Sequence, residues 1–224
     1  MAINRGPLVP GEIYHLYNRS INLEPIFEFK RHCQRALISL EYYQYTNPIE
    51  KLSYFLSRGE SKNRELIDKW KEEHNKHVEI IAYCLMPNHY HLLLKQISEN
   101  GIKDFLSVFQ NSFTRYYNTQ MERKGPIFQG YFKSVRVETD EQLIHLSRYI
   151  HLNPYSSFVV KTIEELENYP WSSLSNYLDG GNSLSVSSDI ILDMFGCRDD
   201  YKKFVFDQAD FQRELEKVKH LTWD

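Results

Sequence analysis

Two short apolar runs flank a proline-asparagine pair near the middle of this 224-residue chain. Residues 80–83 precede the pair and residues 92–94 follow it, whereas Pro87 and Asn88 themselves favour a turn. Apolar runs of this length, bounded by turn residues, are typical of neighbouring β-strands. The sequence therefore predicts two strands joined by a short connection, and the rest of the fold has to be built around them.

Two histidines, His89 and His91, stand two positions apart at the start of the second strand. Because side chains alternate between the faces of a strand, the two imidazoles are expected to share a face and lie close together. Such a pair can bind one divalent metal ion. A pair of histidines on a solvated face would show the same pattern, so the spacing alone leaves both interpretations open.

The remaining apolar patterns extend this pair of strands into an α+β domain. Alternating residues predict strands over residues 11–20 and 131–138, and apolar residues three and four apart predict helices over residues 29–45 and 101–121. The resulting order is strand, helix, strand, strand, helix, strand. This order suits an antiparallel sheet with helices on one face, and we expect the other face to be free for a ligand.

A further helix is predicted to open at a capping box and to close before a proline. Thr139 and Gln142 have the capping-box spacing, and Pro154 predicts the end because the residue before proline is pushed out of the α region. Tyr149 and Asn153 are four residues apart, so they lie one above the other along this helix. Position alone leaves Tyr149 open to two interpretations, a packing residue or a functional phenol.

Charge divides the chain near residue 160. Residues 161–224 carry seven Lys and Arg against thirteen Asp and Glu, although the whole chain has a net charge of only -3. We predict a core over residues 1–160 with a charged helical insertion at about residues 48–78, and an acidic, mostly helical extension over residues 161–224. Five basic residues suit a phosphate-binding stripe or else a solvated helix face: Arg115, Arg123, Lys124, Lys133 and Arg136.

Composition excludes several classes of protein. No apolar run approaches the roughly 18 residues that span a bilayer, and the first residues lack the apolar stretch of a signal peptide. The three scattered cysteines fit neither a disulfide framework nor a cysteine-rich metal site. We therefore expect a cytoplasmic protein with no membrane partner. The high aromatic share of 14% can build a core and can also stack unpaired bases.

Together these features resemble the HUH single-strand nucleases, and most of all the one-tyrosine transposases of the REP-associated and insertion-sequence kinds. The family signature of histidine, bulky residue, histidine is matched by residues 89–91, and its Tyr-Ile-x-x-Asn-Pro helix end by residues 149–154. Residues 128–133 are similar to the family's Trp-Gln-Gly-Arg-Tyr-Lys run but depart from it at Phe128, Tyr131 and Phe132. The likeness covers most of the chain outside about residues 48–78.

The resemblance implies a ferredoxin-like, or RRM-like, HUH nuclease core that cuts and rejoins single-stranded or hairpin DNA by transesterification. Tyr149 would be the nucleophile and would form a 5'-phosphotyrosine. His89, His91 and Asn153 would hold a divalent metal, Mg or Mn, because a mixed imidazole and amide set with open positions is unlike a closed zinc site. The candidates for DNA phosphate contacts are Arg148, Arg136, Lys133 and Arg115.

Two rival functions remain open. A non-catalytic protein on the same fold would bind single-stranded nucleic acid on its sheet and would tolerate the loss of the Tyr149 hydroxyl. A metal hydrolase would use an activated water and would never become attached to DNA. The family contains monomers and helix-exchanging dimers, so a homodimer is also open. Four further histidines are expected in core or surface roles rather than as ligands: His15, His32, His145 and His151.

Overall fold

The computed structural model describes residues 7–46, 48, 50–57, 63, 65, 68, 69, 76–181 and 184–221. At its centre is a four-stranded antiparallel sheet in the order β2-β3-β1-β4. The strands are β1 (Ile13–Arg19), β2 (Val78–Met86), β3 (His89–Gln96) and β4 (Lys133–Arg136). All four lie where alternation and turn residues predicted them, and the α+β class is confirmed.

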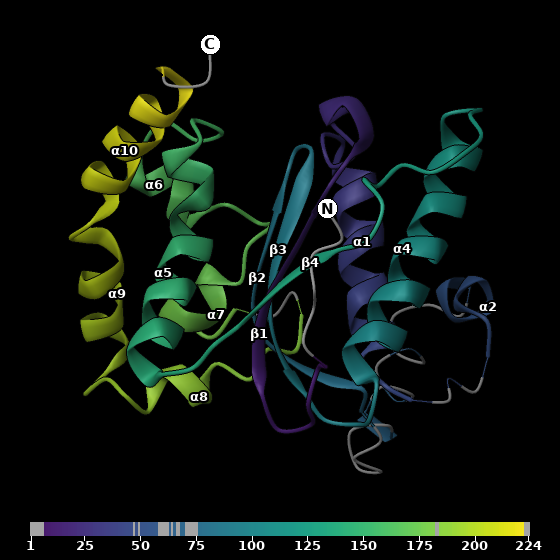
Figure 1. Cartoon of the computed structure of the whole chain (residues 1–224), viewed down its shortest axis with the longest axis horizontal. Coiled ribbons are helices and arrows are strands. Elements are labelled where there is room, and N and C mark those ends of the chain that lie inside the picture. Colours follow the sequence, from purple (N-terminus) through teal and green to yellow (C-terminus); the bar gives the residue numbers. More distant parts are fainter. Residues whose placement is uncertain are drawn as a thin grey trace.

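Two helices, α1 (Lys30–Tyr43) and α4 (Gly101–Gln120), pack on one face of the sheet (Figure 1). Their apolar residues share one buried cluster with alternate residues of the strands, including Leu16 and Leu92. A short 3-10 helix, η1 (Ile21–Leu23), follows β1. Of the predicted insertion, the structure describes α2 (Leu52–Ser57) and a few isolated residues, and the rest lies outside the described residues.

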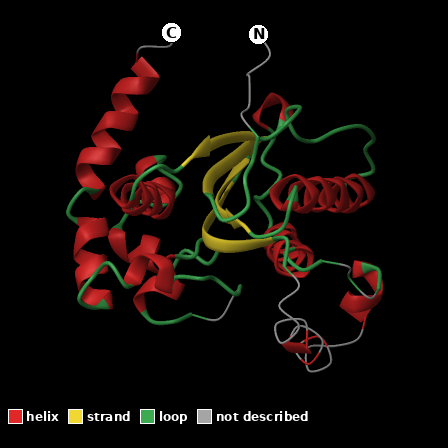
Figure 2. Cartoon of the chain, turned by 60° about the horizontal axis from the view of Figure 1, so that its bottom comes forward, coloured by secondary structure: helices red, strands yellow, loops and turns green. Residues whose placement is uncertain are grey.

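The other face of the sheet carries α5 (Asp140–Ser156), which packs on β2 and β3 (Figures 1 and 2). One buried cluster joins Cys84 and Leu93 of the strands to Ile150 of α5 and Tyr201 of the C-terminal extension. The expectation of a free second face is therefore wrong over β2 and β3, because the extension and α5 bury it. The extension comprises α6 (Ile163–Glu167), α7 (Leu174–Leu178), α8 (Asp189–Leu192), α9 (Arg198–Phe206) and α10 (Ala209–Leu221).

The extension is helical, as predicted, and a boundary near residue 160 stays a prediction. Within the described ranges, no helix combines the length and the apolar character needed to cross a membrane.

The start of α5 agrees with the signal predicted from the sequence, and its end does not. Thr139 caps the helix, since its hydroxyl accepts a hydrogen bond from the backbone N–H of Gln142 at 3.1 Å. The predicted end before Pro154 is wrong, because α5 runs through this proline to Ser156. A proline removes one helical hydrogen bond. The buried Tyr155 offsets this loss, since it packs in the core and its hydroxyl donates to Asp210 of α10 at 2.8 Å.

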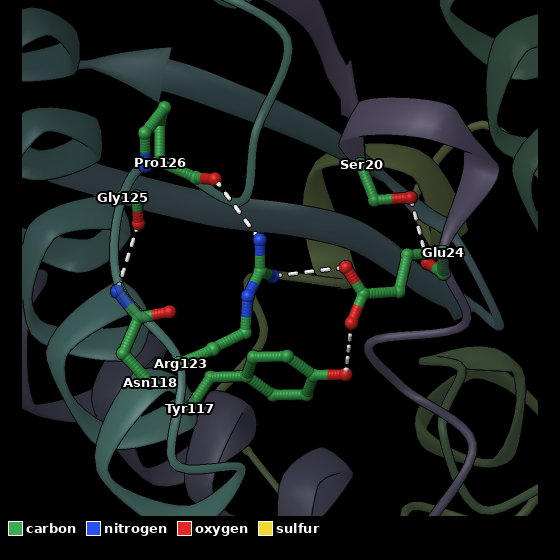
Figure 3. A network of polar contacts seen from close by, with 7 residues as sticks. All are labelled: Ser20, Glu24, Tyr117, Asn118, Arg123, Gly125 and Pro126. Carbon is green, nitrogen blue, oxygen red and sulfur yellow. Dashed lines mark hydrogen bonds and ion pairs between the residues drawn. The ribbon is translucent and has the colours of Figure 1, made fainter.

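A polar network fixes the connection between α4 and β4 (Figure 3). The Glu24 carboxylate accepts a hydrogen bond from the Tyr117 hydroxyl and pairs with Arg123, each at 2.9 Å. Burial, together with the bond to Glu24, raises the pKa of Tyr117 to about 12. Arg123 also donates to the carbonyl oxygen of Pro126 at 3.5 Å. Arg123, a member of the predicted basic stripe, therefore stabilises the fold.

We expect Arg123→Ala to lower the free energy of unfolding by about 1–2 kcal/mol, because it removes charge-assisted hydrogen bonds at a half-buried position. Urea unfolding followed by circular dichroism would measure this loss. Arg115→Ala is the matched control, since Arg115 is an exposed arginine on the preceding helix α4, and it should change stability by less than about 0.5 kcal/mol. Equal losses of stability in the two variants would contradict a stabilising role for the pair of Glu24 and Arg123.

Candidate active site

The register of β1 and β3 gathers a set of polar rings on one face of the sheet. Tyr17 lies opposite His91, and Arg19 lies opposite His89. Residues that lie opposite each other in an antiparallel pair share a face. The ring centroids of His89 and His91 are 5.0 Å apart, and Tyr17 is 5.8 Å from His91 and 5.3 Å from His15. The two predicted ligands thus stand side by side, with His15 and Tyr17 beside them.

Each imidazole of the pair has a partner on the same ring nitrogen. Nδ1 of His89 bonds to Oδ1 of Asn88 at 2.7 Å, and Nδ1 of His91 bonds to Nε2 of His15 at 3.0 Å. Because an amide oxygen only accepts, Nδ1 of His89 carries the proton and Nε2 has a lone pair. Among the described residues, neither Nε2 of the pair makes a hydrogen bond. Both can therefore face a metal ion.

The electrostatics of the site keep these rings neutral. Burial lowers the pKa of His15 to about 4, and burial with the nearby Arg19 lowers that of His89 to about 4. Burial also lowers the pKa of His91 well below its usual value, and the neighbouring His89, His15 and Arg19 add to this effect. A neutral imidazole is the form that binds metal. The pair is therefore ready to act as two ligands at physiological pH.

A tyrosine from a distant helix lies against this pair. The ring of Tyr149 on α5 meets His91 edge-on, with 5.5 Å between centroids, and lies 6.1 Å from His15. The helix is held in this position by Leu143 and Ile150, which are buried in the cluster beneath it. Tyr149 also lines a cavity of about 260 Å³ whose other walls include Phe211 of α10. The fold thus brings the predicted nucleophile to the predicted ligands within one chain.

The predicted third ligand, Asn153, lies one turn after Tyr149 on α5 and is 3% exposed. Its Oδ1 accepts a hydrogen bond from the hydroxyl of Ser157 at 3.3 Å. An amide oxygen has two lone pairs, so one stays available. In the described part of the chain, no three His, Cys, Asp or Glu side chains are grouped to hold a metal ion. Asn153 as a third ligand therefore stays a prediction, and no contact of this side chain with the histidine pair is described.

Lys133 is the predicted phosphate-binding residue that the structure brings to the site. It lies opposite Tyr17 across β1 and β4, and its Nζ is 5.6 Å from the centre of the Tyr17 ring. Arg19, exposed at the end of β1, adds a second positive charge near the pair. Two cations thus border the face that carries the histidines.

The structure places the other three basic candidates differently. Arg136 lies opposite Tyr14, on the face away from His15, and pairs with Glu12 at 2.8 Å. Arg148 adjoins Tyr149 in sequence, but its guanidinium stacks at 4.4 Å on the ring of Phe204 in α9. Arg115 belongs to α4, on the opposite face of the sheet from α5 (Figure 1). None of these three side chains has a described contact with the histidine pair.

Sequence reasoning missed two residues of the site, His15 and Arg19. His15 was expected in a core or surface role, and it is indeed buried, at 7% exposed, but against His91. Alternation along the first strand does show that the two residues share a face. Which strand pairs with β1, and in which register, is needed to see that this face also carries His89 and His91.

A histidine pair on a central strand of a ferredoxin-like sheet, with a tyrosine from a later helix above it, is the layout of the HUH single-strand nucleases. The family model described as "Transposase IS200 like" matches residues 40–153. The match spans half of the chain, so the protein belongs to the IS200-like transposase family, and the resemblance seen in its motifs is confirmed.

A solved structure described as a REP-associated tyrosine transposase bound to a REP hairpin has the same fold. It is 15% identical in sequence, with a TM-score of 0.50, and the alignment covers 84% of this chain and 96% of that one. No curated protein sequence matches this chain.

Proposed function

We propose that this transposase cleaves and rejoins single-stranded DNA by transesterification, with Tyr149 as the nucleophile. The observation that carries the proposal is the edge-on contact of Tyr149 with His91, with 5.5 Å between ring centroids. Family membership supports the enzyme class, and this contact supports the choice of Tyr149 as the nucleophile. Because this contact lies within one chain, the proposal is that a single chain carries out cleavage.

The proposed step exchanges one phosphate ester for another. The phenolic oxygen of Tyr149 bonds to phosphorus, the bond from phosphorus to the 3' oxygen breaks, and the phenolic proton ends on the departing 3' hydroxyl. The products are a 5'-phosphotyrosine and a free 3' end. Because the ester is retained on the protein, another 3' hydroxyl can reverse the step and join a new strand. A phenol is a weak nucleophile at neutral pH, so the site has to assist it.

His89 and His91 would hold a divalent ion, Mg or Mn, and Asn153 would add its amide oxygen. When bound, the ion draws charge from a non-bridging phosphate oxygen and makes the phosphorus easier to attack. The residues present fit such an ion. Both imidazoles are neutral, and Nδ1 of each ring bonds to a neighbouring side chain, which leaves Nε2 for the ion. This donor set differs from the four nitrogen and sulfur ligands of a structural zinc site.

The proposed substrate is a single strand that carries a hairpin, by analogy with the hairpin bound to the solved relative. Lys133 would contact a phosphate beside the histidine pair, which its position opposite Tyr17 supports. Arg148, Arg136 and Arg115 would contact the backbone farther from the cleaved bond, and the first two would first have to leave the partners they hold in this structure. Phosphate contacts of this kind fix the position of a strand rather than read its sequence.

The test is to incubate the protein with a hairpin-tipped single strand and Mn²⁺ and to separate the products on a denaturing gel. We expect a covalent protein–DNA band that carries a label placed on the 3' end of the strand, while a 5' label leaves with the released fragment. Chelation of the metal should prevent both. Cleavage without the covalent band would instead identify a metal hydrolase, and binding with neither would identify a non-catalytic nucleic-acid-binding protein.

A further inference from the structure

We infer that His15 is a positioning residue for the metal-binding pair: its Nε2 accepts a hydrogen bond from Nδ1–H of His91 and so fixes the orientation and tautomer of that ring. The two atoms are 3.0 Å apart and come from positions 76 residues apart in the sequence. The rings lie nearly parallel, at 21°, with 5.2 Å between centroids. This inference rests on the proposed function, because it assigns His91 to the metal.

The tautomer of His91 decides whether it can serve as a ligand. A neutral imidazole that binds a metal through Nε2 must carry its proton on Nδ1. His91 is only 6% exposed, so water is largely absent and the protein itself must accept this proton. His15 provides the acceptor, with its own proton on Nδ1. Without an acceptor there, the ring of His91 could turn or take the other tautomer, which has no lone pair on Nε2.

The same arrangement is found on the other ligand. Asn88, in the turn before β3, holds Nδ1 of His89 at 2.7 Å. Each proposed ligand thus has a separate partner on the ring nitrogen that the metal does not use. Partners of this kind set the orientation of metal-binding histidines and raise their basicity. The partner of His89 is its neighbour in sequence, whereas the partner of His91 comes from β1 and depends on the fold.

His15 is placed to support a ligand rather than to be one. Its Nε2 is occupied by the bond to Nδ1 of His91, on the side of that ring away from the proposed metal. Within the described residues, His15 does not combine with the pair into a group of three side chains able to hold an ion. The ring of His15 is also held by Tyr17, at 5.3 Å between centroids, and by Tyr149, at 6.1 Å. It is therefore a well-fixed acceptor.

The test compares two variants of similar side-chain size that differ in the ability to accept a hydrogen bond. The amide oxygen of His15→Gln can take nearly the place of Nε2, whereas His15→Met has no strong acceptor. We expect His15→Met to weaken Mn²⁺ binding by about 10–100-fold, and His15→Gln to recover most of this loss. Calorimetric titration of the DNA-free chain with Mn²⁺ measures both. His145→Ala, at an exposed histidine on α5, should bind Mn²⁺ like the wild type.

Circular dichroism establishes that each variant is folded, and His15→Ala takes the place of His15→Met if the larger side chain does not fit. Unchanged Mn²⁺ affinity in a folded variant without an acceptor would overturn the inference and leave the proposed function standing.

Pulsed electron paramagnetic resonance counts the nitrogen ligands of Mn²⁺. The same count in the wild type and in His15→Gln supports positioning, and the loss of one nitrogen would show that His15 is itself a ligand. If His89→Ala leaves Mn²⁺ binding unchanged, the proposed metal site fails, and the inference fails with it.

Discussion

Tyr149→Phe is expected to abolish covalent attachment to DNA and to reduce strand cleavage by at least about 1,000-fold, because it removes the oxygen that we propose as the nucleophile and keeps the ring. The ring itself should remain edge-on to His91, since phenylalanine fills the same space at 5.5 Å between centroids. Affinity for hairpin DNA should stay within about twofold of the wild type, since no phosphate contact is assigned to this ring. Denaturing gels with end-labelled strands measure the first two effects, and fluorescence anisotropy measures the third.

The matched control is Tyr155→Phe, on the same helix but bonded through its hydroxyl to Asp210. This variant should form the adduct at close to the wild-type rate, with a small loss of stability. If Tyr149→Phe still cleaved DNA, a water molecule would be the nucleophile, and the chain would be a metal hydrolase. If it lost DNA binding together with cleavage, the tyrosine would be a binding residue and the proposed role would be wrong.

The parts of this fold that could be predicted are those that depend on neighbouring residues in the sequence. Alternation and apolar spacing of three and four placed the sheet strands and the helices of the α+β core, because these periods follow from strand and helix geometry. The same reasoning put His89 and His91 on one face, where their ring centroids are 5.0 Å apart. Thr139 was identified as a cap because its spacing from Gln142 is a local signal.

The parts that could not be predicted depend on which elements meet. The contact of His15 with His91 follows from the register of β1 against β3, which no local pattern reveals. Likewise, alternation puts Lys133 and Arg136 on opposite faces of β4. Only the pairing of β4 with β1 shows that Arg136 is the one that faces away from the histidines. No local pattern indicated that α5 and the C-terminal extension bury the second face over β2 and β3, because their helices have apolar stripes that would suit any partner.

The packing of that extension leads to a second large effect, at His151. This histidine is fully buried in α5, and its two ring nitrogens bond to the Tyr201 hydroxyl at 2.7 Å and the Ser173 hydroxyl at 2.8 Å. It thereby ties α5 to α9 and to the start of α7. We expect His151→Ala to lower the free energy of unfolding by about 3–4 kcal/mol, because it leaves a cavity and removes two buried hydrogen bonds. Urea unfolding in the presence of a chelator measures this loss.

The size of this loss should depend on pH in a direction set by burial, which lowers the pKa of His151 from 6.5 to about 3. Between these values the unfolded chain binds a proton that the folded chain does not, so the stability due to His151 is fully present above pH 6.5 and falls as the pH drops toward 3. The difference in stability between wild type and His151→Ala should therefore be smaller at pH 5 than at pH 7.5.

The control is His145→Ala, at an exposed histidine on the same helix, which should lower the free energy of unfolding by less than about 0.5 kcal/mol. A difference at His151 that is equally large at both pH values would mean that this imidazole can be protonated within the fold, contrary to its enclosure by α5, α7 and α9.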